Sequence, residues 1–420
     1  MKAFLQVALA DVPVGTIGRD ATGALVLEFD PVWQQQTETI PLSLALPRTE
    51  PRHRGAVVQF FFDALLPDHD VVRVRWGREH DVDGTDILAL LGVVGEDLPG
   101  AVQVRPMGRR TRAEPEAVEW LAVDGVALLL SELRRDETAW HGRGEGAFSL
   151  GGAQRKTALL HRDGRWGRPL RRTPSTHILK PGIGEGFPGY ADVEHFCLRL
   201  AANAGLRAAG SQLLTFGAEV AVVVERFDRL VKPGRILRLH QEDICQALGR
   251  DPRRRYAAEG APTAGEIAAM LWSAAQQPRR AVEAFADCLT FQWLIAGTDA
   301  HARNYSIMHS PSGVELSPLY DVASVLPFTR DTGSPRLAMR IGGSVSADAI
   351  GPAEWHAEGV AIGLGGEAMV ARVRKLAQVF PEAIAHTRAE LSATVSVTTM
   401  TTRLANLLEQ RCAQCVERMK

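Results

Sequence analysis

The residues best suited to chemistry lie just after a long apolar segment that ends near residue 297. Asp299 and Asn304 stand five positions apart in TDAHARN (298–304), which follows the apolar run FQWLIAG and its last residue, Gly297. Glycine commonly ends helices, so both side chains are expected on a loop just beyond a rigid helix. The spacing D-x-x-x-x-N is typical of a protein-kinase catalytic loop, in which the Asp accepts the proton of the substrate hydroxyl and the Asn oxygen holds Mg²⁺.

A second acidic position follows at Asp321 in LSPLYDVAS, seventeen residues after Asn304. The intervening letters SIMHS, PSG and VELSP predict a β-hairpin, which places Asp321 just after a strand. Mg²⁺ requires oxygen ligands, and Asn304 and Asp321 supply a suitable pair, so both are predicted metal ligands. The alternative role of Asp321 is that of an N-cap for a helix over VASVL.

A lysine and a glutamate earlier in the chain could hold the phosphates of a nucleotide. THILKP (176–181) predicts a strand that ends with Lys180, and Glu194 follows fourteen residues later near the start of a predicted amphipathic helix, Val193–Ala204. Protein kinases use an ion pair of this kind to position the lysine that contacts the α- and β-phosphates. The alternative is that Lys180 and Glu194 are ordinary surface residues.

A glycine-rich loop precedes this strand. In SLGGAQRKT (149–157), Gly151 and Gly152 allow the backbone to approach phosphates closely, and Arg155 and Lys156 add positive charge. The loop is not a Walker A motif, because the residue before Lys156 is an arginine and not a glycine. The alternative interpretation is a glycine-rich hairpin turn.

A possible hinge follows the predicted strand of AEVAVVVERF (218–227). This apolar run leads directly into Glu225, Arg226 and Phe227. A kinase hinge at this place would offer backbone groups to the adenine and an apolar contact to its ring. These three residues are therefore predicted to contact the nucleotide.

The elements that would position these residues change along the chain of 420 residues. FLQVAL, VGTIG and ALVLEF predict short strands, VVQFFFDALL a helix, and DILALLGVVGEDLPGAVQV a helix followed by a strand. MGRRTRAEPEAVEW (107–120) is expected to be a connection, and TALLHRD, WGRPL and THILK predict further strands. After residue 240 the pattern is helical almost throughout. We therefore expect an α+β fold with domains at 1–105, 106–230 and 231–420.

Composition limits the function classes. The chain is 45% hydrophobic and 23% charged, with a net charge of −1, which gives no overall reason to expect nucleic acid as a partner. The run Arg250–Arg255 could contact substrate, DNA or only solvent. No signal peptide or membrane span is recognisable, so we expect a cytoplasmic protein. Cys412 and Cys415 form a lone C-x-x-C without a second pair, and we interpret them as buried thiols and not as a zinc site.

Taken together, these segments resemble the HipA family of serine/threonine kinase toxins. The similar stretches are FFDALLPD (61–68), LLGVVGEDLPGAV (90–102), SLGGAQRKTALL (149–160), THILKP (176–181), AVVVERFDR (221–229), HQEDICQALG (240–249), WLIAGTDAHARNYSI (293–307) and LSPLYDVAS (316–324). The resemblance implies a two-lobed, protein-kinase-like fold, with a β-rich N-terminal lobe, an additional N-terminal subdomain and an all-helical C-terminal lobe.

The resemblance also implies roles for individual residues. Asp299 matches the catalytic base, and Glu194 matches the partner of the nucleotide-binding lysine. Ser149 matches a site of inhibitory autophosphorylation; a phosphate there would bring negative charge beside Lys156 and could eject the loop. The residues expected to contact the nucleotide are Gly151, Gly152, Ala153, Gln154, Arg155, Lys156, Lys180, Glu225, Arg226, Phe227, His301, Asn304, Tyr320 and Asp321, and the expected metal ligands are Asn304 and Asp321.

By the same resemblance, the chain is expected to use ATP and Mg²⁺ as the toxin of a type II toxin–antitoxin module. Its expected partners are a helix-turn-helix, HipB-like antitoxin, operator DNA through that antitoxin, and a protein substrate such as an aminoacyl-tRNA synthetase, with no membrane involved. Two alternatives remain at this point. One is a kinase-shaped co-repressor with weak catalysis, and the other is a metal hydrolase built on Asp299 and His301, for which further regularly spaced His ligands are absent.

Overall fold

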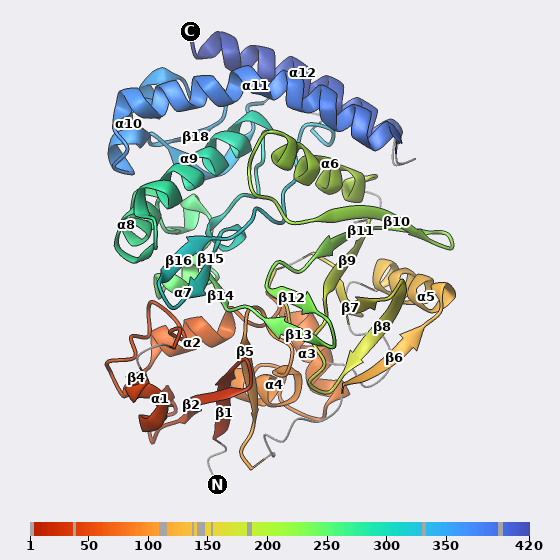
Figure 1. The fold of residues 1–420 in the computed structure, drawn as a ribbon, viewed down its shortest axis with the longest axis vertical. Helices are drawn as coiled ribbons and strands as arrows, with labels where there is room; N and C mark the ends of the chain where they lie inside the picture. Colours follow the sequence, from red (N-terminus) through yellow and green to blue (C-terminus); the bar gives the residue numbers. More distant parts are fainter. Residues whose placement is uncertain are drawn as a thin grey trace. The chain divides into compact units, whose positions relative to one another are not determined.

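The computed structural model describes residues 4–36, 39–108, 116–136, 138–140, 148–152, 154–182, 187–329, 333–393 and 398–420. The chain divides into two compact units, each assembled from several segments. Unit 1 contains residues 1–181, 214–253 and 308–311, and unit 2 contains residues 182–213, 254–307 and 312–420. Most strands lie in the first 243 residues and the longest helices follow them (Figure 1), as expected for the predicted α+β class.

Unit 1 begins with an antiparallel sheet in the order β4-β3-β2-β1-β5. Its strands are β1 (Leu5–Leu9), β2 (Val12–Arg19), β3 (Leu25–Phe29), β4 (Arg52–Arg54) and β5 (Val102–Pro106). Alternate residues of a strand share one face, and in β1 the side chains of Leu5, Val7 and Leu9 all join the core. The strands predicted for the first 30 residues and for the segment after residue 100 are thereby confirmed.

Short helices complete the core of this first sheet. They are α1 (Pro31–Gln35), α2 (Ala56–Asp63), α3 (Asp70–Glu79) and α4 (Ile87–Val94). Phe62, Trp76 and Leu91, one from each of the last three helices, are buried in the same cluster as the strand residues. The helices predicted at VVQFFFDALL and DILALLGVV are confirmed, although α2 ends three residues earlier than expected.

The second sheet of unit 1 has the order β10-β11-β9-β7-β8-β6. Its strands are β6 (Ala117–Leu121), β7 (Thr157–Arg162), β8 (Arg165–Leu170), β9 (His177–Pro181), β10 (Ser211–Phe216) and β11 (Glu219–Glu225), and α5 (Val123–Arg135) packs against β9 and β11. Leu179 of β9 joins the core beneath α5, so the next residue, Lys180, points to the opposite face of the sheet. The connection predicted for residues 107–120 is corrected at its end, because β6 pairs with β8 there.

Four charged side chains form a buried cluster in unit 1, which we call the ion cluster: Asp97, Arg226, Asp228 and Arg229. Arg226 bonds to Asp228 at 2.9 Å and Arg229 bonds to Asp97 at 2.8 Å, with no side chain of the four more than 5% exposed. Burial alone would raise the pKa of Asp97, but attraction to the two guanidinium groups holds it below its usual value. The ion cluster therefore fixes the segment after α4 against the end of β11.

The remaining elements of unit 1 are short. They are the hairpin β12 (Arg229–Lys232) and β13 (Arg235–Arg238), then β14 (Gln241–Asp243) and α7 (Ile244–Ala247). Next to β14, the rings of His240 and His309 stack 4.8 Å apart, and His309 Nε2 lies 2.9 Å from a carboxylate oxygen of Glu242. All three side chains are buried.

Unit 2 is dominated by helices. They are α6 (Tyr190–Asn203), α8 (Ala264–Ala274), α9 (Pro278–Leu294), α10 (Pro352–Ala361), α11 (Gly366–Ala393) and α12 (Thr399–Arg418), with short 3₁₀ turns η1 (Ala257–Glu259) and η2 (Ala302–Asn304). The long helix α11, drawn in blue in Figure 1, packs against α6, α9, α10 and α12. The helical prediction for this part of the chain is confirmed, and α6 begins three residues before the predicted start.

Short strands accompany these helices. They are β16 (Gly313–Leu316), β17 (Arg336–Ile341), β18 (Ser344–Ser346) and the start of β15 (Ser306–Ser310), whose residues from 308 on belong to unit 1. The predicted hairpin after the catalytic loop is confirmed, because the backbone N–H of Ser317 donates to the carbonyl of Ser306 at 2.8 Å. The C-terminal part of the chain is thus mainly, but not entirely, helical.

A proline inside α11 is compensated by a neighbouring helix. Pro381 has no N–H group, so the carbonyl of Ala377, four residues earlier, loses its usual helical donor. The thiol of Cys412 on α12 donates to this carbonyl at 3.5 Å. Cys412 and Cys415 are both buried, and burial raises the pKa of Cys412 to about 12, which agrees with the interpretation of this C-x-x-C as packed thiols.

Two further expectations concern the whole chain. Among the described residues, no helix is at once long enough and apolar enough to traverse a lipid bilayer. The predicted domain boundaries at residues 105 and 230 stay predictions, and the two units follow a different division, because unit 1 contains most of the first two predicted domains.

Candidate active site

The loop that carries Asp299 and Asn304 begins where α9 ends. Ala296 adopts a left-handed backbone conformation (φ 53°), and the N–H of Gly297 donates to the carbonyl of Gln292 at 2.8 Å. This bond and the left-handed residue before it are those of a Schellman motif, in which the left-handed residue is usually glycine. The prediction of a helix end here is confirmed, but the strained residue is Ala296. A Cβ atom at Gly297 would lie 1.9 Å from the side-chain oxygen of Gln292, so a larger residue there would require that side chain to move.

Residues 298–304, which we call the catalytic loop after their predicted role, are held by hydrogen bonds to one another. The carbonyl of Asp299 accepts from the backbone N–H of His301 at 2.8 Å and from the side-chain amide of Asn304 at 2.7 Å. Asn304 and His301 are buried, whereas Asp299 is exposed. The loop therefore presents the Asp299 carboxylate to solvent while its backbone is fixed from behind.

Asp321 is tied to this loop through its neighbour. The hydroxyl of Tyr320 donates to the carbonyl of Arg303 at 2.7 Å and lies 2.6 Å from the hydroxyl of Ser306. Asp321 follows Tyr320 in the chain, and Asn304 follows Arg303. The bond between Tyr320 and Arg303 therefore joins the two segments that carry the predicted metal ligands. Asp321 has a left-handed backbone (φ 55°), and the described residues after it form no helix at VASVL. The alternative role of Asp321 as a helix N-cap is therefore wrong.

The pKa of Tyr190, the first residue of α6, responds to the charges of these carboxylates. Burial raises the pKa of the Tyr190 hydroxyl well above its usual value, and the negative charges of Asp321, Glu194 and Asp299 raise it further, in that order. Charge effects of this kind fall off with distance. Three carboxylates predicted from separate sequence segments thus act on one hydroxyl group in unit 2.

Two aromatic contacts border the site. The ring of Tyr190 stacks on Phe328 at a centroid distance of 5.8 Å. On the catalytic loop, the hydroxyl of Tyr256 donates to the Asp299 carboxylate at 2.5 Å, and the Tyr256 ring meets the His301 ring edge-on at 5.1 Å. His301, predicted to contact the nucleotide, is therefore at least in part a packing residue of this loop.

The donor set of unit 2 suits a magnesium ion. Because the nitrogen of the Asn304 amide donates to Asp299, the amide oxygen is left as the group that can face a cation. Asp321 adds a carboxylate, and Mg²⁺ is commonly held by one or two such protein ligands together with substrate phosphates. Among the described residues, no group of three or more His, Cys, Asp or Glu side chains is arranged to hold a metal, so the hydrolase alternative gains no support.

The predicted nucleotide lysine lies in unit 1. Lys180 is 5% exposed on β9, where it is opposite Val222 of β11. Glu194 is 1% exposed on α6 of unit 2. The role predicted for both residues is an ion pair with each other. That pair stays a prediction, as does the contact of Lys180 with phosphates.

Two residues of the glycine-rich loop, Lys156 and Gly151, bond to each other. The ammonium group of Lys156 donates to the carbonyl of Gly151 at 2.7 Å and lies 5.1 Å from the centre of the Trp140 ring. Ser149 is fully buried, with its hydroxyl donating to the carbonyl of Leu65 at 2.6 Å. The positive φ of Gly152 (96°) confirms that a glycine is needed in this turn.

The other predicted nucleotide contacts of this loop are Ala153, Gln154 and Arg155. Arg155 donates to the carbonyl of Arg134 near the C-terminus of α5 at 2.7 Å, where a cation is favourable. Gln154 is half-buried. Ala153 lies outside the described residues. The contacts of these residues with a nucleotide stay predictions.

The predicted hinge is divided between two roles. The guanidinium group of Arg226 belongs to the ion cluster, and its backbone N–H donates to the carbonyl of Thr176 at 2.9 Å. Arg226 is therefore a structural residue of unit 1, and its side chain is unavailable to an adenine. Glu225 is exposed and Phe227 half-buried, and their predicted nucleotide contacts remain untested.

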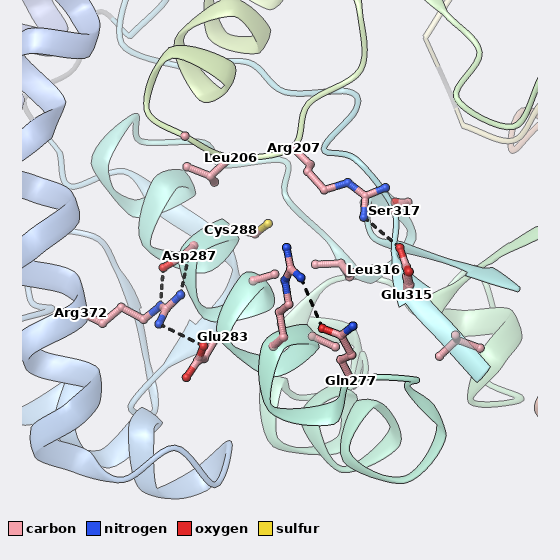
Figure 2. A pocket seen from close by; sticks show the side chains of 15 residues that line it. Leu206, Arg207, Gln277, Glu283, Asp287, Cys288, Glu315, Leu316, Ser317 and Arg372 are labelled. Carbon is pink, nitrogen blue, oxygen red and sulfur yellow. Dashed lines mark hydrogen bonds and ion pairs between the residues drawn. The ribbon is translucent and has the colours of Figure 1, made fainter. Parts of the chain in front are cut away.

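A separate cavity of about 440 Å³ lies elsewhere in unit 2. Figure 2 shows its charged lining, in which Arg372 bonds to Asp287 at 2.5 and 2.7 Å and approaches Glu283 at 3.7 Å. None of the predicted site residues is among the described residues that line it. This cavity is therefore distinct from the candidate active site.

Sequence reasoning missed Tyr190, Tyr256 and the ion cluster. Tyr256 directly follows the arginine run 250–255, whose fate was left open. In the structure Arg255 lies over the Tyr256 ring at 5.6 Å, and Arg253 approaches Asp63 and Asp70 at 3.8 Å. The run is thus partly engaged with the protein itself, and no local pattern in the sequence links Tyr256 to Asp299, 43 positions away.

An α+β fold in which a D-x-x-x-x-N loop is tied to a second aspartate defines a protein-kinase-like class of protein. Family models agree in detail: the HipA-like C-terminal domain matches residues 148–384 and the HipA N-terminal domain matches residues 5–105. The chain belongs to the HipA family.

Individual relatives agree with this assignment. The chain is 33% identical over 378 residues to Y4mE of Sinorhizobium fredii, named as a candidate kinase, with 89% of each chain covered. It is 28% identical over 406 residues to the serine/threonine-protein kinase toxin HipA of Shewanella oneidensis, covering 91% of this chain and 88% of the relative. The solved complex of Shewanella oneidensis HipA with HipB and operator DNA matches with a TM-score of 0.82 and 25% identity, over 99% of this chain and 96% of that chain. The predicted family and kinase-like fold are confirmed.

Proposed function

We propose that this protein is an ATP-dependent serine/threonine protein kinase that transfers the γ-phosphoryl group of ATP to a protein target. The observation that carries the proposal is the bond between Tyr320 and Arg303, which brings Asp321 beside the catalytic loop of Asp299 and Asn304. The kinase names of its relatives support the same activity.

Each residue has a distinct task in the proposed mechanism. Asp299 orients the acceptor hydroxyl and takes its proton as the oxygen attacks the γ-phosphorus, and the bond between that phosphorus and the leaving oxygen of ADP breaks. Lys180 neutralises phosphate charge, and Glu194 holds the lysine in place. Phosphoryl transfer depends mainly on positioning and on charge stabilisation, so fixed groups matter more than flexible ones.

Asn304 and Asp321 are the proposed metal ligands. A bound Mg²⁺ would neutralise negative charge on the phosphates during transfer. The hydrogen bond from Asn304 to the Asp299 carbonyl would orient the amide for this task and keep the two residues in register.

Autophosphorylation of Ser149 is part of the proposal. The Ser149 hydroxyl is buried and bonded to Leu65, so the loop must leave its present position before this hydroxyl can be modified. A phosphate carries close to two negative charges at neutral pH and could not return to a fully buried site without a large cost. Modification would therefore hold the glycine-rich loop open.

The partners follow from the relatives. We propose that the chain is the toxin of a type II toxin–antitoxin module, bound by a HipB-like helix-turn-helix antitoxin and through it to operator DNA. The solved complex of the Shewanella oneidensis HipA with HipB and operator DNA supports this assignment. The proposed targets are aminoacyl-tRNA synthetases, whose phosphorylation would stop translation.

Asp299→Asn tests the proposed activity. The purified chain and the variant are incubated with radiolabelled ATP, Mg²⁺ and a cell extract, and labelled proteins are separated and identified by mass spectrometry, including any phosphopeptide that contains Ser149. Loss of the base should reduce transfer at least about 100-fold. The control Asp81→Asn makes the same change at an exposed position and should leave transfer unchanged.

Three outcomes separate the candidate functions. Labelled protein that disappears with Asp299→Asn supports the kinase. ATP binding without any transfer by the unmodified chain supports the co-repressor instead. Full transfer by Asp299→Asn would show that another residue acts as the base.

A further inference from the structure

A tyrosine already occupies the carboxylate that the proposed kinase would use as its base. The hydroxyl of Tyr256 donates to Oδ1 of Asp299 at 2.5 Å, and both residues belong to unit 2. A serine or threonine acceptor must donate its own hydroxyl to this carboxylate within hydrogen-bonding distance before its proton can be removed. The phenol and the acceptor hydroxyl therefore compete for the same carboxylate.

We propose that Tyr256 occupies the acceptor-hydroxyl position of the phosphoryl-transfer site and restrains the enzyme until an acceptor hydroxyl displaces it. This inference rests on the proposed kinase function. Tyr256 makes a self-inhibitory contact, and the space that its hydroxyl occupies is the binding site of an alcohol group.

The segment around Tyr256 is built to hold the ring in this place. The backbone N–H groups of Arg255 and Tyr256 each lie 3.2 Å from one carboxylate oxygen of Glu259, at the end of η1. The carbonyl of Arg255 accepts from the N–H of Ala302 on the catalytic loop at 3.4 Å. The ring rests edge-on against His301. The phenol is thus aimed at Asp299 by backbone contacts that do not depend on its hydroxyl group.

The contact is also able to exchange. Tyr256 is half-exposed and Asp299 is exposed, so an incoming side chain or a water molecule can reach the bond from solvent. Burial and the bond to Asp299 raise the pKa of Tyr256 to about 12, which keeps the phenol protonated as a donor at neutral pH. Arg255 opposes this shift, but the phenol still donates to Asp299 as a neutral group.

A purely positioning role for Tyr256 is disfavoured by the bonds behind Asp299. The carbonyl of Asp299 is already held by His301 and by Asn304. The backbone of the loop therefore has its own restraints, and the phenol adds a bond only at the reactive end of the side chain.

The first experiment detects the contact without relying on activity. Tyrosine labelled with ¹³C at Cζ gives one NMR signal for each of the four tyrosines, and the signal of Tyr256 is the one missing in Tyr256→Phe. Asp299→Asn should shift this signal at neutral pH, whereas the signal of Tyr305, assigned with Tyr305→Phe, should stay in place. An unchanged Tyr256 signal would overturn this inference alone, whatever the kinase activity.

The second experiment measures turnover with water as the acceptor, so that no protein target is needed. Tyr256→Phe keeps the ring but removes its hydroxyl group. A water molecule can then take the place of that hydroxyl and donate to Asp299. ATP hydrolysis should rise about fivefold, because a larger share of the enzyme has a free base, while the KM for ATP stays within about twofold. The matched control Tyr305→Phe changes a buried ring that packs on Phe285 with ring centroids 5.5 Å apart, and it should hydrolyse ATP at the unmodified rate.

The double variant Tyr256→Phe with Asp299→Asn completes the test, and it should show no rise. A fall in hydrolysis with Tyr256→Phe would mean that the phenol positions the base, and an unchanged rate would mean that it only packs; either result overturns the self-inhibitory contact. A shifted NMR signal together with no labelled protein from any form in the radiolabelled-ATP assay would instead overturn the proposed kinase function, and this inference with it.

Discussion

The ion cluster of unit 1 and the catalytic loop of unit 2 both gather carboxylates, but they do so in opposite ways. In the ion cluster, the buried carboxylates of Asp97 and Asp228 meet the guanidinium groups of Arg226 and Arg229. On the catalytic loop, the exposed carboxylate of Asp299 meets a neutral phenol. A buried ion pair is difficult to change, whereas an exposed carboxylate with a neutral partner can exchange that partner. The comparison separates residues that hold the fold from residues that can react.

The largest effect is expected at the reactive side of the comparison. Asp321→Asn removes one anionic oxygen from the proposed metal site, and phosphoryl transfer should fall about 100-fold or more at fixed Mg²⁺ concentration, because negative charge at a metal site contributes several kcal/mol. The thermal midpoint should stay the same, since Asn tolerates the left-handed backbone found at this position (φ 55°). Transfer within threefold of the unmodified rate, measured across a Mg²⁺ series, would remove Asp321 from the site.

The structural side of the comparison predicts the opposite pattern. Asp97→Asn removes one of the two buried carboxylates that Arg229 contacts and should lower the free energy of unfolding by about 3–5 kcal/mol. Urea unfolding provides the measurement. The control Asp81→Asn, at an exposed turn, should change stability by less than about 0.5 kcal/mol. A cost for Asp97→Asn as small as that of the control would contradict the view that the ion cluster stabilises unit 1.

A smaller effect should appear with pH. Burial and the neighbouring His309 lower the pKa of His240 to about 3, below its ordinary value of 6.5. Below pH 6.5, His240 therefore binds a proton in the unfolded chain but stays neutral in the folded chain. The free energy of unfolding decreases as the pH falls toward 3. The loss is at most about 1.4 kcal/mol per pH unit, or about 2 kcal/mol between pH 6.5 and 5.

The measurement for this prediction is urea unfolding at several pH values between 7 and 5. His240→Gln should remove that part of the slope even if it lowers stability at every pH. His80→Gln, at an exposed ring, serves as the control and should leave the slope intact. An unchanged slope in His240→Gln would show that this ring is not kept neutral by the fold.

Local patterns accounted for much of the fold and supplied the residues of the candidate site. Alternating apolar residues predicted the strands on which Lys180 and Glu225 lie, and the helical spacing predicted α6 and α9. The positions of Asp299, Asn304 and Asp321 followed from spacing and from a hairpin between them. These features depend on neighbours within about 20 residues, which is the range over which a single sequence is informative.

The features that the sequence did not reveal depend on distant segments. Arg226 was predicted to be a hinge residue, but its side chain bonds across 129 positions to Asp97. Tyr256 reaches Asp299 across 43 positions, and no local pattern marks such a pair. A charged residue after an apolar strand looks the same in a sequence whether it faces a ligand or a buried partner, and only the tertiary contacts distinguish the two.

The pairing of Pro381 with the Cys412 thiol has a consequence for how the C-terminal helices can evolve. A proline in the interior of α11 leaves a carbonyl to be served from α12, so the two positions are expected to change together. A lineage that replaces the proline by alanine restores the helical donor and no longer needs the thiol. Where the proline is kept, serine is the substitute for Cys412 that best preserves a donor of similar size.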